Sequence, residues 1–291
     1  MGNKVSGKVI SEIKKSMHRI QKAKVVQLSD FIMPKDVKTV DEIIKMGYDP
    51  VHAAYISAQN ILSYFCEKVS SLPALEEFCQ LGELATQEYM PSGPPWSPLT
   101  TSYFSCWLYF DVTFGSDRET IATCLIDVFE TLMPFPLKKI EFMLDVIDTM
   151  QASRMGIYEH CGMKGDYVIL KELVSEREEV CLVPVRYSGE EGQLWLVRIL
   201  PSLYGDTHHP VVFTTPYIIE SPGKNEWLGY FQEVLPKFGL SNNNSALNWL
   251  MKYGLTRFYW PQYIFSSFCG NIREAIFLKG LPKSTLKVQA F

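Results

Sequence analysis

Four successive stretches decide the fold of this chain: YVILKELV (167–174), EVCLVPVRY (179–187), QLWLVRIL (193–200) and VVFTTPYII (211–219). They are rich in β-branched and aromatic residues, and turn-forming residues separate them, which is typical of strands. Short strands that follow one another in sequence usually pair with their neighbours as antiparallel hairpins. We therefore expect a small antiparallel four-stranded sheet or half-barrel over about 167–219.

Two of these stretches indicate their positions in the sheet. The third is apolar on both faces apart from Arg198, which predicts a strand covered on both sides. Pro184 in the second stretch has no backbone N–H to donate, so this strand is predicted to lie at an edge or to carry a bulge.

Helical periodicity dominates on both sides of the strands. Thr39 with Glu42 predicts a capping box, and after Pro222 apolar residues recur at helical spacing as far as Ile276. The prediction is an α+β fold in a single domain over residues 31–291. Its parts are a helical N-terminal region at 31–155, a strand block at 166–219 and C-terminal helices at 222–280.

A proline-rich segment, PSGPPWSPL at 91–99, interrupts the N-terminal helices. The following residues, 102–114, read as extended and strongly aromatic. We expect the rigid segment to pack across the sheet or the adjoining helices, with Trp96 at least partly buried and a ligand groove along this seam. The candidate ligand-binding residues are Trp96, Trp107, Trp195 and Arg198.

Composition is typical of a folded chain, since 47% of the 291 residues are hydrophobic. The formal net charge of −4 argues against a protein whose whole surface binds nucleic acid. Seven cysteines occur without C-x-x-C spacing, which favours reduced thiols over disulfides or zinc. The sequence shows neither a signal peptide nor an apolar run of membrane-spanning length, so we expect a cytoplasmic protein.

The N-terminal segment, residues 1–30, is basic and amphipathic. Seven lysine and arginine residues within 4–24 accompany a single acid, Glu12, and apolar residues recur between them at near-helical spacing. We favour a helix that lies on the body of the protein, and the alternative is a weak contact of residues 4–24 with an anionic surface. Gly2 also lies in an N-myristoylation pattern, which has meaning only in a eukaryotic cell.

Candidate catalytic chemistry is sparse, because the motifs of the common enzyme classes are absent from the sequence. Cys161 could act as a thiol nucleophile, but the adjacent His160 usually points elsewhere, so the base would be His209 or His208. A metal ion could alternatively be held by Asp206, by one of His208 and His209, and by His160 or Glu159. Their spacing matches no recognised ligand pattern, and we assign no metal ligand and no cofactor.

The leading hypothesis is therefore a non-catalytic binding or assembly protein whose partner is an unknown protein or small molecule. Aromatic and apolar residues are abundant while catalytic groups are scarce. The alternative is a hydrolase or metal-dependent enzyme that uses a cluster of His160, Cys161 and His209.

Five segments carry a resemblance that covers the chain from about residue 90 onward. They are PSGPP (91–95), YEHCG (158–162), GQLWLVR (192–198), VVFTTPY (211–217) and AIFLKGLP (275–282). In these segments the chain resembles a family of uncharacterised bacterial hypothetical proteins. The resemblance implies a bacterial cytoplasmic origin and weakens the N-myristoylation interpretation. That family has no assigned activity, fold or ligand, so the resemblance transfers no functional residue.

Overall fold

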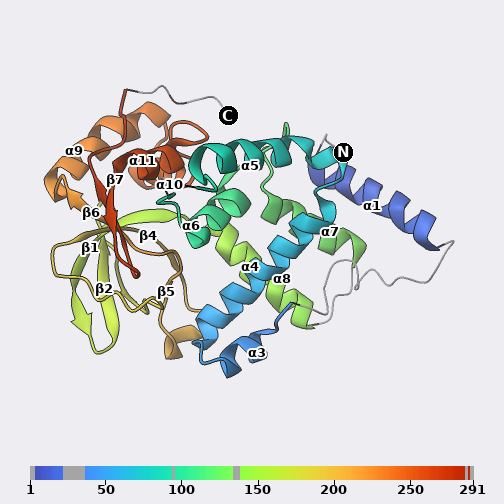
Figure 1. Cartoon of the computed structure of the whole chain (residues 1–291), viewed down its shortest axis with the longest axis horizontal. Helices are drawn as coiled ribbons and strands as arrows, with labels where there is room; N and C mark the ends of the chain where they lie inside the picture. The colour runs from blue at the N-terminus through green and yellow to red at the C-terminus, as the bar shows by residue number, and fades with distance from the viewer. Residues whose placement is uncertain (1–3, 22–36, 94–95, 134–137, 286–287, 289–291) are drawn as a thin grey trace. The chain divides into compact units, whose positions relative to one another are not determined.

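A computed structural model describes residues 4–21, 37–93, 96–133, 138–285 and 288 of the chain (Figure 1). The chain divides into two compact units. The helical unit contains Met1–Leu84 and Trp107–Ala152, and the sheet unit contains Ala85–Cys106 and Ser153–Phe291. The single domain that we expect over 31–291 stays a prediction.

The helical unit is built from helices and helical turns. Their bounds are α1 (Val5–Gln21), α3 (Val40–Lys45), α4 (Pro50–Val69), η1 (Pro73–Leu75), α5 (Glu76–Tyr89, shared with the sheet unit), η2 (Trp107–Asp111), α7 (Ile121–Leu132) and α8 (Lys138–Ala152). The capping box at Thr39 is confirmed, since its hydroxyl accepts from the Glu42 N–H and the Glu42 carboxylate accepts from the Thr39 N–H.

Helix α1 lies on the body of the helical unit. Val5, Val9 and Ile13, spaced by four residues, are buried, and α1 contacts α7. The carboxylate of Glu119 accepts hydrogen bonds from the backbone N–H groups of Val5 and Ser6. Both groups lie in the first turn of α1, where backbone N–H groups have no acceptor within the helix itself. This is the arrangement that we favoured for the basic segment. Its residues 1–3 and 22–30 lie outside the described part of the chain, and Gly2 is among them.

The expectation of an extended segment at residues 102–114 is wrong. This segment forms α6 (Thr101–Cys106), which continues directly into η2, a π-helical turn. The reason is helical spacing, because Tyr103, Cys106, Trp107 and Phe110 follow an i, i+3, i+4, i+7 pattern and all four are buried.

A mixed eight-stranded sheet forms the centre of the sheet unit, so the prediction of a small four-stranded antiparallel sheet is wrong. The strands are β1 (Met155–Lys164), β2 (Tyr167–Glu172), β3 (Glu178–Cys181), β4 (Leu194–Leu200), β5 (Val211–Val212), β6 (Tyr217–Ser221), β7 (Phe268–Asn271) and β8 (Ile276–Lys279). Their order is β3-β2-β1-β4-β6-β8-β7, and β5 pairs with β4. The stretch with Pro184 does give an edge strand, β3, which ends before the proline.

The sheet is larger than predicted because its last two strands come from the C-terminal region. After β6 the chain forms α9 (Lys224–Val234), η4 (Leu235–Phe238), α10 (Asn243–Tyr253) and α11 (Tyr259–Ser267), and only then β7 and β8. Strand β8 pairs in parallel with β6, and a parallel pair requires a long crossover of this kind. The expected purely helical region at 222–280 is therefore wrong, because its end completes the sheet.

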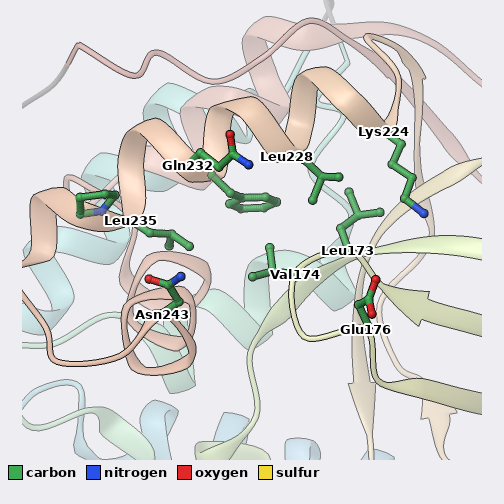
Figure 2. A pocket seen from close by; sticks show the side chains of 10 residues that line it. Leu173, Val174, Glu176, Lys224, Leu228, Gln232, Leu235 and Asn243 are labelled. Atoms are coloured by element: carbon green, nitrogen blue, oxygen red, sulfur yellow. The ribbon is translucent and has the colours of Figure 1, made fainter.

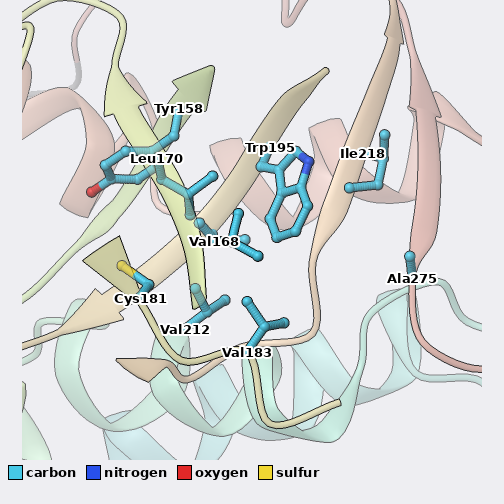
Figure 3. Close-up of a cluster of buried hydrophobic side chains, with 10 residues drawn as sticks. Tyr158, Val168, Leu170, Cys181, Val183, Trp195, Val212, Ile218 and Ala275 are labelled. Carbon is cyan, nitrogen blue, oxygen red and sulfur yellow. The ribbon is translucent and has the colours of Figure 1, made fainter. Parts of the chain in front are cut away.

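The core of the sheet unit surrounds the indole of Trp195 on β4 (Figure 3). Val168 and Leu170 of β2, Cys181 of β3 and Ile218 of β6 belong to the same buried cluster. Nearly every side chain of β4 is buried, as expected for a strand covered on both faces.

Within the described ranges of the chain, no helix has both the length and the apolar character that a membrane crossing requires. This finding concerns the described helices alone.

Candidate functional site

The sheet unit contains an open groove between helix α9 and the turn that joins β2 to β3 (Figure 2). Its volume is about 420 Å³. We call it the α9 groove and define it by the residues that line it: Leu173, Val174, Glu176, Lys224, Leu228, Phe231, Gln232, Leu235, Pro236 and Asn243. Ligand pockets in proteins commonly enclose about 300–1,000 Å³.

The apolar walls of the groove follow from local sequence. Leu228, Phe231 and Leu235 recur at helical spacing and lie on one face of α9 and the turn after it. Leu173 and Val174 end the β2 segment and face them across the groove (Figure 2). The N–H of Leu173 donates to the Ile157 carbonyl at 3.0 Å, which fixes this wall to β1.

One end of the groove carries charges that are already balanced. The Nζ atom of Lys224 lies 2.6 Å from the carboxylate of Glu159, and this hydrogen bond raises the pKa of the lysine. Glu176 lies 3.8 Å from the ammonium of Lys171. The four side chains together carry no net charge.

Two amides lie away from this charged end, Gln232 beside the middle of the groove and Asn243 at its opposite end (Figure 2). Gln232 on α9 and Asn243 at the start of α10 are both exposed and each offers a donor and an acceptor. The preceding residue, Asn242, caps α10 by accepting from the N–H of Ser245 at 2.7 Å. The groove therefore has an apolar middle and hydrogen-bonding ends.

The predicted catalytic cluster is centred on His160, which is buried on β1. Its Nδ1 atom lies 3.2 Å from the backbone nitrogen of Gly162, and its Nε2 atom lies 2.9 Å from the carbonyl oxygen of Ser188. Its ring also packs against Trp195, with centroids 5.5 Å apart. Both ring nitrogens are engaged by the backbone, so the geometry makes His160 a structural residue.

Cys161 and His209 have separate surroundings. Cys161 is exposed, and the pKa of its thiol is raised by partial burial and by Glu159, which is the opposite of the shift that activates a nucleophile. The ring of His209 packs against that of Tyr167 in a tilted arrangement, with centroids 3.9 Å apart. In the described part of the chain, no group of three or more histidine, cysteine or acidic residues could hold a metal ion. The side chain of Asp206 lies outside that description.

Three of the four predicted ligand-binding side chains are interior. Trp107 in the helical unit, and Trp195 and Arg198 in the sheet unit, are at most 3% exposed. Arg198 donates to the hydroxyl of Ser153 at 3.2 Å. None of these side chains lines the α9 groove.

The expected burial of Trp96 is wrong, because this residue is 72% exposed. Its neighbours anchor the segment instead. The hydroxyl of Ser97 donates to the Tyr89 carbonyl and accepts from the N–H of Leu99, and Leu99 is buried. These contacts fix the backbone while the indole points away from the unit, so the reason for expecting a groove at this seam is lost.

The sequence predicts the apolar face of α9 but not the groove that this face lines. Leu228, Phe231 and Leu235 are predicted as part of one apolar helix face, and two of them, Phe231 and Leu235, are buried. The opposite wall, Leu173 and Val174, lies more than 50 residues earlier, so no local pattern connects the two.

Comparisons of the chain with protein-family models, with curated proteins and with solved structures find no match. The resemblance to uncharacterised bacterial proteins therefore stays a prediction.

Proposed function

We propose that this protein is a non-catalytic binding protein whose ligand occupies the α9 groove. The observation that carries the proposal is the combination of a 420 Å³ groove, apolar walls and hydrogen-bonding ends. This pattern is typical of ligand sites in which apolar side chains provide contact area and a few polar groups fix the orientation of the ligand.

The chemistry of the lining supports binding rather than catalysis. Lys224, the lining residue with a resolved pKa shift, has a raised pKa because it pairs with Glu159, whereas a catalytic lysine needs a lowered pKa. Among the described lining residues there is neither a histidine nor a cysteine. The described lining thus lacks the two side chains most often used as a base or a thiol nucleophile, and its lysine is paired with a carboxylate.

The proposal can be tested by filling the groove. Leu228→Trp places a larger side chain on the α9 wall, and Leu240→Trp, at a position that is 47% exposed and outside the lining, is the matched control. A library of small uncharged fragments is titrated into the protein with methyl-labelled leucine and valine, and NMR shifts are recorded.

We expect binding fragments to shift the methyl signals of Leu173, Val174, Leu228 and Leu235. Leu228→Trp should abolish these shifts, and Leu240→Trp should preserve them. Fragments that shift only other methyl groups, or that bind equally well to both variants, would contradict the proposal.

A further inference from the structure

We infer that the α9 groove binds an uncharged, apolar peptide segment of a partner protein. This inference rests on the proposed function and names the class of its ligand. Three features of the groove carry it: the charge balance, the open rim and the two amides.

The charge balance argues against a charged ligand. Lys224 contacts Glu159 at 2.6 Å, and Glu176 contacts Lys171 at 3.8 Å. A ligand carboxylate would compete with Glu159 for Lys224, and a ligand ammonium would compete with Lys171 for Glu176. An uncharged group leaves both pairs intact.

The open rim argues for a ligand with one polar and one apolar side. The apolar lining consists of the partly buried Val174 and Leu228 together with the buried Leu173, Phe231 and Leu235. The amides of Gln232 and Asn243 are exposed. An alkyl chain in such an open groove would leave part of its surface in water. A peptide can place its side chains on the apolar walls and keep its backbone at the hydrated rim.

The amides of Gln232 and Asn243 fit a peptide backbone. Gln232 and Asn243 each present a carbonyl oxygen and an NH₂ group, and a peptide unit presents the complementary N–H and C=O. Pairing of this kind involves no net charge, in agreement with the balanced charges beside Lys224.

The test compares three probes by NMR titration: N-acetyl-Ala-Leu-Leu-Ala-amide, the same peptide with a free C-terminal carboxylate, and octanoate. We expect the blocked peptide to bind a few-fold more tightly than the free-acid peptide, because the acid competes with Glu159 for Lys224 at a partly exposed ion pair. We expect octanoate to bind more weakly than the blocked peptide.

A single substitution should reverse the charge preference. Glu159→Gln removes the carboxylate that pairs with Lys224 and leaves the ammonium available to a ligand. The free-acid peptide should then bind several-fold more tightly than it binds the unmodified protein, while the affinity of the blocked peptide should change little. Glu190→Gln, an exposed acid outside the lining, is the matched control and should alter neither affinity.

The outcomes separate the two proposals. If fragments bind in the groove but none of the peptides does, or if octanoate or the free-acid peptide binds best to the unmodified protein, the peptide inference is overturned and the binding function stands. If neither fragments nor peptides bind in the groove, the proposed function itself fails. Blocked-peptide binding that Leu228→Trp abolishes supports both.

Discussion

The Nε2 atom of His160 lies 2.9 Å from the carbonyl oxygen of Ser188. Because the backbone N–H of Gly162 reaches Nδ1, that nitrogen must be the acceptor, and Nε2 must carry the proton that it donates to Ser188. The neutral imidazole therefore links β1 to the turn that precedes β4. A ring held by two backbone groups in the interior cannot also accept a proton from a nucleophile without losing one of these hydrogen bonds.

We predict that His160→Ala lowers the free energy of unfolding by about 2–3 kcal/mol. The substitution leaves two backbone groups without partners and removes the imidazole that packs against Trp195. Cys161→Ala, the neighbouring exposed position, should change this free energy by less than about 0.5 kcal/mol. Urea denaturation measures both values. Equal stability of His160→Ala and the unmodified protein would remove the structural role that we assign to this residue.

The seven cysteines should all be free thiols. Burial raises the pKa of Cys66 to about 12 and also raises those of Cys124 and Cys181, whereas Cys161 and Cys269 are exposed. Thiol titration of the unfolded, unreduced protein should count seven free groups. In the folded protein, mass spectrometry should find Cys161 and Cys269 alkylated first. A count of five or fewer would show that a disulfide forms.

Docking of α1 should contribute to stability. Val9 is fully buried, so Val9→Asp places an unpaired carboxylate against the apolar surface of the helical unit and should destabilise it by about 3 kcal/mol or more. Lys8→Asp, at the adjacent exposed position, is the matched control and should have a small effect. Urea denaturation measures both. An undiminished stability of Val9→Asp would mean that α1 does not pack on this unit in solution.

The same helix tests the alternative interpretation of the basic segment. If α1 only packs on the helical unit, the unmodified protein should show no salt-sensitive binding to vesicles of anionic lipid. Co-sedimentation at low and high salt measures this. Salt-sensitive binding that is lost on deletion of residues 4–21, in a protein that remains folded, would favour the anionic-surface contact.

Sequence patterns predict the parts of this fold that depend on neighbouring residues. The capping box at Thr39, the β2–β3 hairpin and the doubly covered β4 all depend on local spacing and appear as expected. Local patterns do not predict strand β8, because its four residues pair with β6, more than 50 residues earlier in the chain.

The candidate site is harder to predict for the same physical reason. His160 and Cys161 draw attention because their side chains are reactive, but reactivity depends on partners that only the fold supplies. Trp195 and Arg198 draw attention as large side chains, and the sheet buries both. The α9 groove forms between the turn that joins β2 to β3 and a helix about 50 residues later in the chain. No local sequence pattern connects these two segments.

Two ion pairs that involve the β2 segment should differ greatly in their contribution to stability. Arg154 lies 2.7 Å from Glu172, and the two side chains are only 16% and 9% exposed. Arg154→Leu leaves the Glu172 carboxylate buried without its cation and should destabilise the sheet unit by about 3–5 kcal/mol. Lys171→Leu removes an exposed partner of Glu176 and should cost about 1 kcal/mol or less. Urea denaturation of the two variants measures the difference, and similar effects would contradict the assigned difference in burial.

The pH dependence of stability should report on His52, in the first turn of α4. Burial lowers the pKa of this imidazole from 6.5 to about 4, although Asp49 opposes the shift. Between pH 6.5 and pH 4 the unfolded chain therefore binds a proton that the folded protein excludes. The stability that neutral His52 contributes is fully present above pH 6.5 and is lost as the pH falls towards 4, by about 3 kcal/mol in total. Urea denaturation at several pH values should show that His52→Gln removes most of this loss, while His208→Gln, in a loop of the sheet unit, retains it. An unchanged slope in His52→Gln would mean that other groups cause the acid sensitivity.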